Sequence, residues 1–144
     1  MSPSAESVEV GSARRSDLDA VLSVWEIARS PWATTVDDDA GLERLCRHDR
    51  DALIVARTGD HVIGAAIAAW DGWRGHIYRV AVLPEHRLKG IGAALVLEAH
   101  ARLKARGARR VDVAVAAPDE TATAFWTAIG YRRDAAMGRF GFPL

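Results

Sequence analysis

The sequence predicts a mixed α/β (α+β) fold, in which a mostly antiparallel sheet is flanked by helices. Apolar residues recur at a spacing of two in several short stretches, as in strands, and at a spacing of three to four in longer ones, as in helices. The composition agrees, because 144 residues that are 49% hydrophobic and 26% charged are enough to bury one core. We therefore expect residues 1–144 to form a single domain.

The stretch that organises the chain is a strand, a turn and a helix in its middle. Residues 77–83 form an apolar, β-branched run that stops at Pro84, which indicates a buried strand. The pattern Arg-x-x-Gly-x-Gly-Ala follows at residues 87–93, and a helical pattern begins there. Glycines at such a junction leave backbone N–H groups uncovered, and the helix dipole favours an anion beside them. The turn is therefore predicted to bind a phosphate.

Spacing narrows the kind of phosphate site. A dinucleotide fingerprint would need a glycine where Leu95 stands, and a Walker loop would need the lysine after its last glycine, whereas Lys89 precedes Gly90. Arg87 and Lys89 add positive charge, and an arginine can bind phosphate oxygens through two parallel hydrogen bonds. A pyrophosphate is the expected ligand. A helix start without any ligand is the simpler alternative.

Before this stretch the chain predicts one strand, two helices and two further strands. Alternation indicates a strand at 8–13, and helical spacing indicates a helix from 16 to 28. The acidic triplet 37–39 suits the N-terminus of a second helix, and we interpret it as caps rather than metal ligands. Strands are expected at 53–56 and 62–70, joined by a hairpin turn.

After this stretch the predicted elements are a helix, a strand, a short helix and a last strand. The helix opened by the glycine turn should run to about residue 106, and valines alternate through 111–115. Asp119 or Thr121 is expected to cap the short helix. A last strand or hairpin is expected at 137–142.

Several partner classes are disfavoured by composition. The 19 basic and 19 acidic residues cancel, so no charge excess points to nucleic acid. No apolar run reaches the ~18 residues of a membrane span. Residues 1–7, which we expect to be flexible, lack the apolar h-region of a signal peptide. The single cysteine, Cys46, suits a reducing compartment as a structural thiol. We expect a cytoplasmic monomer or homodimer without a membrane partner, and without a metal because no metal-ligand spacing occurs.

A second motif lies downstream of the glycine turn and gives the chain a family resemblance. Residues 125–131 read Phe-Trp-Thr-Ala-Ile-Gly-Tyr. Together with the turn at 87–93 and the element order, they resemble the GNAT family of N-acetyltransferases over about residues 8–142. An Asp-Gly-x-Arg-Gly turn at 71–75 is similar to a subgroup of small bacterial members.

The resemblance implies an acyltransferase that moves acetyl from acetyl-CoA, as cosubstrate, to a primary amine by direct attack. Strand residues 80–82 would pair with the pantetheine arm like an added strand, in a gap that faces 113–115, and the amides of 88–93 would hold the pyrophosphate. The implied cofactor residues are Val80, Ala81, Val82, Arg87, Leu88, Lys89, Gly90, Ile91, Gly92, Ala93, Asp119 and Trp126.

Two departures from the family pattern bear on the chemistry. Trp126 stands where the family's tyrosine often protonates the leaving thiolate, and an indole N–H is no acid at neutral pH. Asp119 stands where many members have an asparagine. The alternative role for Trp126 is packing in the core.

Two rival functions stay open for the protein. One is a weak or inactive acyl-CoA-binding module of the same fold, and the other is an unrelated phosphate-binding protein.

Two side chains of the central strand are the catalytic candidates. His76 and Tyr78 are two residues apart and therefore share a face of the strand. By the resemblance, His76 falls where members of the family carry a catalytic glutamate or a histidine. An imidazole is a suitable general base near pH 7. The alternative is a surface histidine that only forms hydrogen bonds. Tyr78 would assist the leaving group. Glu85 and Asp71 are the fallback bases.

Two tryptophans are candidates for the acceptor pocket. Trp25 and Trp32 lie where the family's first helices line that pocket, and core packing is the alternative for Trp25. The acceptor stays open among a metabolite amine, an antibiotic, a peptide N-terminus and a lysine.

Overall fold

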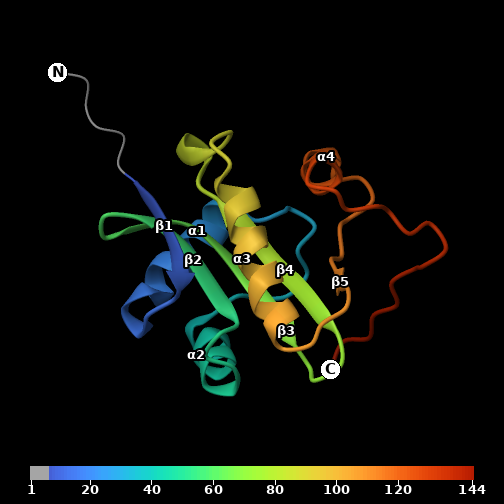
Figure 1. The fold of residues 1–144 in the computed structure, drawn as a ribbon, viewed down its shortest axis with the longest axis horizontal. Helices are drawn as coiled ribbons and strands as arrows, with labels where there is room; N and C mark the ends of the chain where they lie inside the picture. Colours follow the sequence, from blue (N-terminus) through green and yellow to red (C-terminus); the bar gives the residue numbers. More distant parts are fainter. Residues whose placement is uncertain (1–6) are drawn as a thin grey trace. The chain divides into compact units, whose positions relative to one another are not determined.

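The computed structural model describes residues 7–144 (Figure 1). The expected flexibility of 1–7 therefore concerns residues that, except for Ser7, lie outside the described range. The chain packs as two compact units, one ending at Ala114 and one running from Val115 to Leu144. Its elements are, in order, β1 (Val8–Ser12), η1 (Arg15–Asp17), α1 (Leu18–Ala28), α2 (Asp39–His48), β2 (Leu53–Thr58), β3 (His61–Trp70), β4 (Gly75–Val82), η2 (Pro84–His86), α3 (Ile91–Ala105), β5 (Val111–Asp112) and α4 (Glu120–Ala128).

The first unit is built on a sheet of five strands in the order β1-β2-β3-β4-β5. Neighbouring strands from β1 to β4 run antiparallel, and β5 runs parallel to β4. A parallel neighbour needs a crossover connection, which α3 supplies. The predicted fold class, a mixed and mostly antiparallel sheet with helices, is confirmed.

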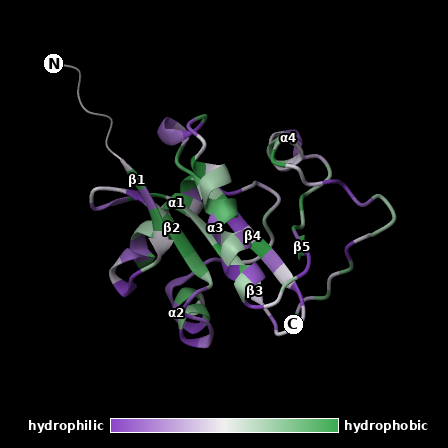
Figure 2. Ribbon diagram, viewed as in Figure 1, coloured by the Kyte–Doolittle hydropathy of each residue, from purple (hydrophilic) through white to green (hydrophobic). Residues whose placement is uncertain are grey.

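Helices cover both faces of this sheet. A Cβ added to Gly64 of β3 would lie 3.2 Å from Leu95 of α3, whereas the next residue, Ala65, belongs to the core cluster that contains Trp25 of α1. Adjacent strand residues point to opposite faces, so α3 and α1 lie on opposite sides. All of β2 is buried, as expected for a strand covered twice, and Figure 2 shows it largely in the hydrophobic colour.

A buried ion pair joins η1 to β2. The two guanidinium N–H groups of Arg57 donate to the carboxylate of Asp17 at 3.0 and 2.8 Å, and the Arg14 amide donates to it as well. Burial alone would raise the pKa of Asp17, but these hydrogen bonds and the Arg57 charge outweigh it and hold that pKa below its ordinary value. The pair therefore stabilises the fold at neutral pH, and this contribution is lost as the pH falls through the lowered pKa.

Two predicted strands differ from the structure. The alternating valines of 111–115 suggested a full strand, but only Val111 and Asp112 find partners on β4. The strand expected at 137–142 is not formed; this segment has no helix or strand, and Phe140 and Phe142 are 98% and 86% exposed. Two glycines and a proline within 138–143 lower its β propensity, and alternation alone does not supply a partner strand.

Candidate functional site

The two catalytic candidates lie side by side on β4. His76 is half-buried and pairs with Ala69 of β3 and with Asp112 of β5, whereas Tyr78 pairs with Ile67 of β3. The two rings stack with centroids 6.0 Å apart and planes at 14°. The prediction that His76 and Tyr78 share a face is confirmed. Tyr78 is 47% exposed, so part of its side chain is open to a ligand.

The edge of β4 that faces β5 is free along most of its length. Within the first unit, pairing with β5 stops at His76, so residues 77–82 have no strand partner on that side. Such an edge offers unpaired backbone groups to an extended ligand. The Ala81 side chain is buried, so this residue reaches a ligand only through its backbone. Arg87 folds back from the turn, and its Nε donates to the Val82 carbonyl at 3.1 Å.

The glycine turn at 87–93 has uncovered amides, as its sequence predicts. Leu88 and Gly90 adopt the left-handed conformation, with φ of 62° and 79°, and the Leu88 side chain is fully exposed. No side chain caps α3, and the first amide with a helical hydrogen bond is that of Ala94, which donates to the Gly90 carbonyl at 3.0 Å. The amides before Ala94 meet the positive end of a helix of 15 residues. These residues fit a pyrophosphate.

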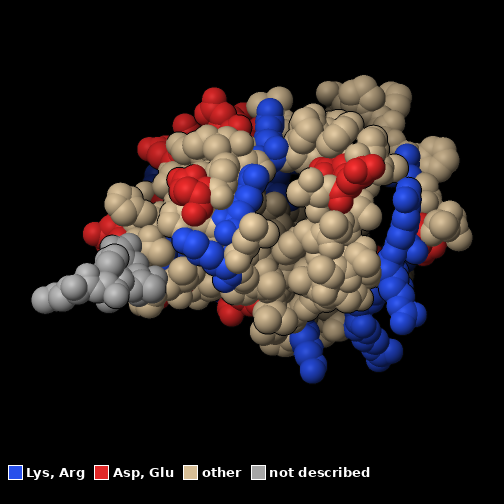
Figure 3. Space-filling model, turned by 90° about the horizontal axis from the view of Figure 1, so that it is seen from above, with Lys and Arg blue, Asp and Glu red and all other residues tan. Residues whose placement is uncertain are grey.

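Charge supports this turn only locally. Arg87 and Lys89 are both exposed beside the free amides. Figure 3 views the molecule from above relative to Figure 1. On the described surface seen there, Lys and Arg side chains lie next to Asp and Glu side chains, and the charge is not of one sign. The turn therefore depends on its own amides and two cations, and not on a broad positive surface.

In the second unit, the two cofactor candidates are engaged within α4 and its flanks. Asp119 is the N-cap of α4, and its Oδ1 accepts a hydrogen bond from the Ala122 amide at 3.0 Å, as one of the two predicted caps. Trp126 makes edge contacts with Phe125 and Tyr131, whose ring centroids lie 5.1 and 4.7 Å away. Asp119 therefore stabilises the start of α4, and Trp126 packs against neighbouring aromatic rings.

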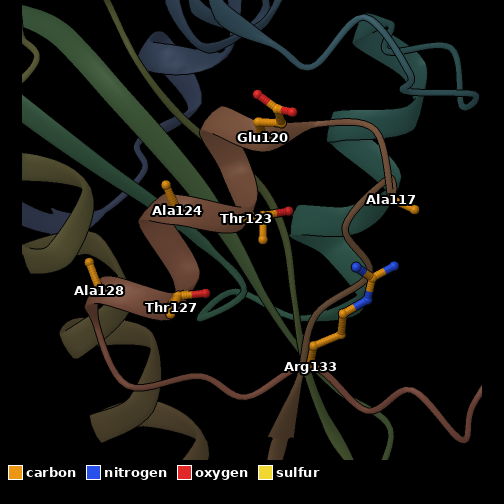
Figure 4. A pocket seen from close by; sticks show the side chains of 7 residues that line it. All are labelled: Ala117, Glu120, Thr123, Ala124, Thr127, Ala128 and Arg133. Carbon is orange, nitrogen blue, oxygen red and sulfur yellow. The ribbon is translucent and has the colours of Figure 1, made fainter.

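An open hollow of about 600 Å³ lies along α4 (Figure 4). The hydroxyls of Thr123 and Thr127 point toward the side on which Arg133 lies. The lining otherwise consists of Glu120 and three alanines, Ala117, Ala124 and Ala128. None of the residues that the sequence assigns to acetyl-CoA or to an acceptor lines it, so the hollow adds nothing to the site on β4.

The remaining candidates separate clearly. Trp25 is 1% exposed and belongs to the core, the alternative that the sequence left open, whereas Trp32 is 46% exposed in the segment between α1 and α2. Among the fallback bases, Asp71 accepts hydrogen bonds from the backbone N–H groups of Arg74 and Trp73, which hold its pKa below the ordinary value and make it a weaker base. Glu85 is exposed in η2.

Sequence reasoning missed two residues next to the site. Arg79 lies in the middle of β4 with a left-handed φ of 54°, and its Nε donates to Asp37 at 3.0 Å. Asp37 was expected to be a helix cap, but Asp38 caps α2 instead. One signal for Arg79 is present in the sequence, because a charged residue interrupts an otherwise apolar strand.

Residues 7–144 offer neither a metal site nor a membrane-spanning helix. No group of three or more His, Cys, Asp or Glu side chains in this range is placed to hold a metal ion. No helix in the same part of the chain is both long and apolar enough to span a bilayer.

Comparison with known proteins identifies the family. The sequence model of the acetyltransferase (GNAT) family matches residues 19–131. An acetyltransferase of Pectobacterium atrosepticum is 29% identical over 126 residues, 86% of this chain and 87% of that one. Ard1 from Thermoplasma volcanium has a TM-score of 0.77 at 18% identity, over 89% of this chain and 84% of its own. A GNAT family acetyltransferase from Brucella melitensis, solved in complex with acetyl-CoA, has a TM-score of 0.65 at 22% identity, over 90% and 85%. Because the family model spans most of the chain, this protein belongs to the GNAT family and is an acetyl-CoA-dependent acetyltransferase.

Proposed function

We propose that the protein transfers the acetyl group of acetyl-CoA to a primary amine by direct attack of the amine on the thioester. The observation that carries the proposal is the arrangement along β4. One strand presents the His76 imidazole, a free backbone edge at 77–82 and, after a short connection, the uncovered amides of 88–93. A ligand that is extended in its middle and charged at one end fits that order.

The cosubstrate is held mainly by backbone groups. Residues 80–82 pair with the pantetheine arm along the free edge, and the amides of 88–93 hold the pyrophosphate, with charge from Arg87 and Lys89. For Arg87, the Nε contact with the Val82 carbonyl leaves its Nη groups for phosphate. Asp119 and Trp126, which belong to the second unit, are the other two residues that the family resemblance assigns to acetyl-CoA.

The reaction needs two protons removed from the acceptor nitrogen, one before and one after the attack, and one thiolate released. His76 takes a proton from the acceptor ammonium, so that the amine nitrogen is free to attack the thioester carbonyl carbon. A C–N bond forms, the C–S bond breaks, and the sulfur leaves with the electron pair of that bond. Tyr78 or water donates a proton to the thiolate, which is a tolerable leaving group on its own because thiols are weakly acidic. The imidazolium returns its proton to solvent. The nitrogen of the new C–N bond loses its second proton, which replaces the proton that Tyr78 or water gave to the thiolate.

The rival function is a catalytically weak acyl-CoA-binding module. The observation in its favour is Trp126, which replaces the expected acid and packs against Tyr131. We place this reaction in the cytoplasm, because a single cysteine, which cannot form an internal disulfide, suits a reducing compartment.

The test is acetyl-CoA turnover against a panel of amines. The panel holds phenethylamine and spermidine as metabolite amines, kanamycin as an antibiotic, Nα-acetyl-lysine as a lysine, and a peptide with an N-terminal alanine, so that it covers the four acceptor classes that the sequence leaves open. Release of CoA that depends on one amine, together with the acetylated amine by mass spectrometry, supports the proposal. Tight binding of CoA in calorimetry with turnover by none of the five amines supports the binding module.

A further inference from the structure

The starting point is a strained residue in the middle of β4. The register of β3 and β4 shifts between the pairs Ile67–Tyr78 and Ala65–Ala81. Over this interval β4 advances by three residues and β3 by two, so β4 contains a β-bulge. Arg79 lies in this bulge with φ of 54°. A residue with a Cβ adopts that conformation only where its surroundings hold it there, and such residues concentrate at functional sites.

Both the backbone and the side chain of Arg79 are held. The indole Nε1 of Trp25 donates to the Arg79 carbonyl at 2.9 Å, and Trp25 is fixed in the core. The Arg79 Nε donates to Asp37 Oδ1 at 3.0 Å, and its Nη2 donates to the Thr35 carbonyl at 2.7 Å. Since Trp25 belongs to α1, which packs on a face of the sheet, the Arg79 carbonyl is turned out of the ladder toward that helix.

The partners of the Arg79 side chain belong to one segment, residues 29–38, which joins α1 to α2 (Figure 1). This segment has no helix or strand of its own. Asp37 is also 3.5 Å from the guanidinium of Arg29 at the end of α1, and the neighbouring Asp38 caps α2. Among the described residues, Asp37–Arg79 is the ion pair that ties this segment to the sheet.

The pair is sheltered enough to act as a fixed link. The Asp37 and Arg79 side chains are 14% and 18% exposed, so their contact is screened less than that of a surface pair. The second oxygen of Asp37 is buried and accepts no hydrogen bond from the described residues. The carboxylate is thus held between two arginines and cannot turn to water without breaking the contact.

We propose that Asp37 and Arg79 are positioning residues, which fix segment 29–38 against the β4 bulge and so place the amine acceptor opposite the acyl group. The inference rests on the proposed function and on Trp32 of this segment, which the family resemblance assigns to the acceptor pocket. Tyr78 precedes Arg79 directly, and Trp32 lies three residues before Thr35, so one arginine connects the two exposed aromatic residues of the site. The turn at 87–93 lies outside this link, so cosubstrate binding does not depend on it.

The experiment compares Asp37→Asn and Arg79→Gly with wild type. Asp37→Asn removes the charge at constant shape, and Arg79→Gly removes the side chain and also the strain of a positive φ. Hydrogen exchange is measured without an acceptor, in the presence and absence of acetyl-CoA. We expect the amides of 30–38 to exchange about tenfold faster in both variants, because a charge-assisted contact has been lost, and those of α3 to be unchanged.

Two controls separate positioning from stability. Asp17→Asn breaks a buried pair elsewhere in the fold and should lower the unfolding temperature without a local effect at 30–38. Arg79→Lys keeps the charge and should restore part of the slow exchange that Arg79→Gly loses. Kinetics then use the amine of the panel with the highest turnover. The acceptor KM should rise about tenfold in Asp37→Asn, with the acetyl-CoA Kd within about twofold of wild type.

The outcomes are decisive in each direction. Unchanged exchange at 30–38 in Asp37→Asn and Arg79→Gly overturns the link, and so does a general acceleration that includes α3. Faster local exchange with an unchanged acceptor KM overturns the positioning role while the acetyltransferase reaction stands. If wild type acetylates none of the amines, the proposed function fails, and the exchange of 30–38 alone decides whether the pair is the link.

Discussion

The two ends of β4 show two ways of building a site. Beyond its C-terminal end, the turn at 87–93 presents backbone amides, and its left-handed glycine and uncapped helix leave them free. Near its N-terminal end, His76 and Tyr78 contribute side chains. Arg79, between the two ends, is held by Asp37 and Thr35, which precede it in the sequence by 42 and 44 positions. A site made of backbone groups is determined by a few neighbouring residues in the sequence. A site made of side chains depends on the distant residues that the fold brings into contact with them.

This difference predicts different responses to substitution. At the turn, a change that fills space or adds negative charge should affect the cosubstrate, because the amides cannot be replaced by another group. At the other end, removal of a side chain should affect the chemistry and leave cosubstrate affinity intact. A clean separation of the two effects would support the arrangement proposed along β4.

The largest effect is expected for Gly92→Glu. A carboxylate at Gly92, in the first turn of α3, repels the pyrophosphate beside the free amides, so acetyl-CoA affinity should fall by about 10³-fold. Calorimetry measures it. Gly11→Glu in β1 is the matched control, because a side chain at Gly11 would meet nothing within 4 Å. Equal acetyl-CoA affinity in Gly92→Glu and wild type would remove the turn from the site.

The next effect is expected for His76→Ala. Loss of the proposed base should lower kcat/KM for the amine by about 10²-fold, since general base catalysis contributes about that much or more. Acetyl-CoA affinity should not change. His48→Ala, at the exposed end of α2, is the control for loss of an imidazole. If His76→Ala keeps the wild-type kcat/KM on an amine that is truly acetylated, His76 is structural and the base lies elsewhere.

A smaller effect is expected for Arg87→Ala. Its guanidinium is exposed and also contacts the Val82 carbonyl, so its charge-assisted contact with phosphate should contribute near the lower end of the usual range, about 1.5 kcal/mol. Acetyl-CoA affinity should therefore fall about tenfold, and by less at high salt. A loss that does not depend on salt would argue that Arg87 acts by holding the end of β4 rather than by its charge.

The same contrast explains what the sequence could predict. The strand, the turn and α3 follow from a run of β-branched residues, a proline and two glycines, all of which act through the backbone within a few residues. The shared face of His76 and Tyr78 follows from the period of two in a strand. The full extent of β5 and a final strand could not be predicted in the same way, since a ladder needs a partner that alternation does not encode.

The link around Arg79 was not predictable for a related reason. The partners of its side chain come from a segment about forty residues earlier, and the acidic triplet at 37–39 already had a sufficient local explanation as a helix start. Asp38 does act as the cap, so local reasoning was right about the triplet and silent about Asp37. The charge within an apolar strand was the one available signal.

The smallest effect is expected for Trp126→Phe. If the indole has replaced the acid of other family members without taking over its role, the thiolate leaves without help from this position, and kcat at saturating substrates should change by less than about threefold. The substitution keeps an aromatic ring against Tyr131 and Phe125, so α4 should stay folded. Tyr78→Phe is the informative partner, because it removes a hydroxyl from the face of β4 that carries His76 and should lower kcat more than Trp126→Phe does. A large loss of kcat in Trp126→Phe, with unchanged acetyl-CoA affinity, would show that the indole N–H takes part in the reaction.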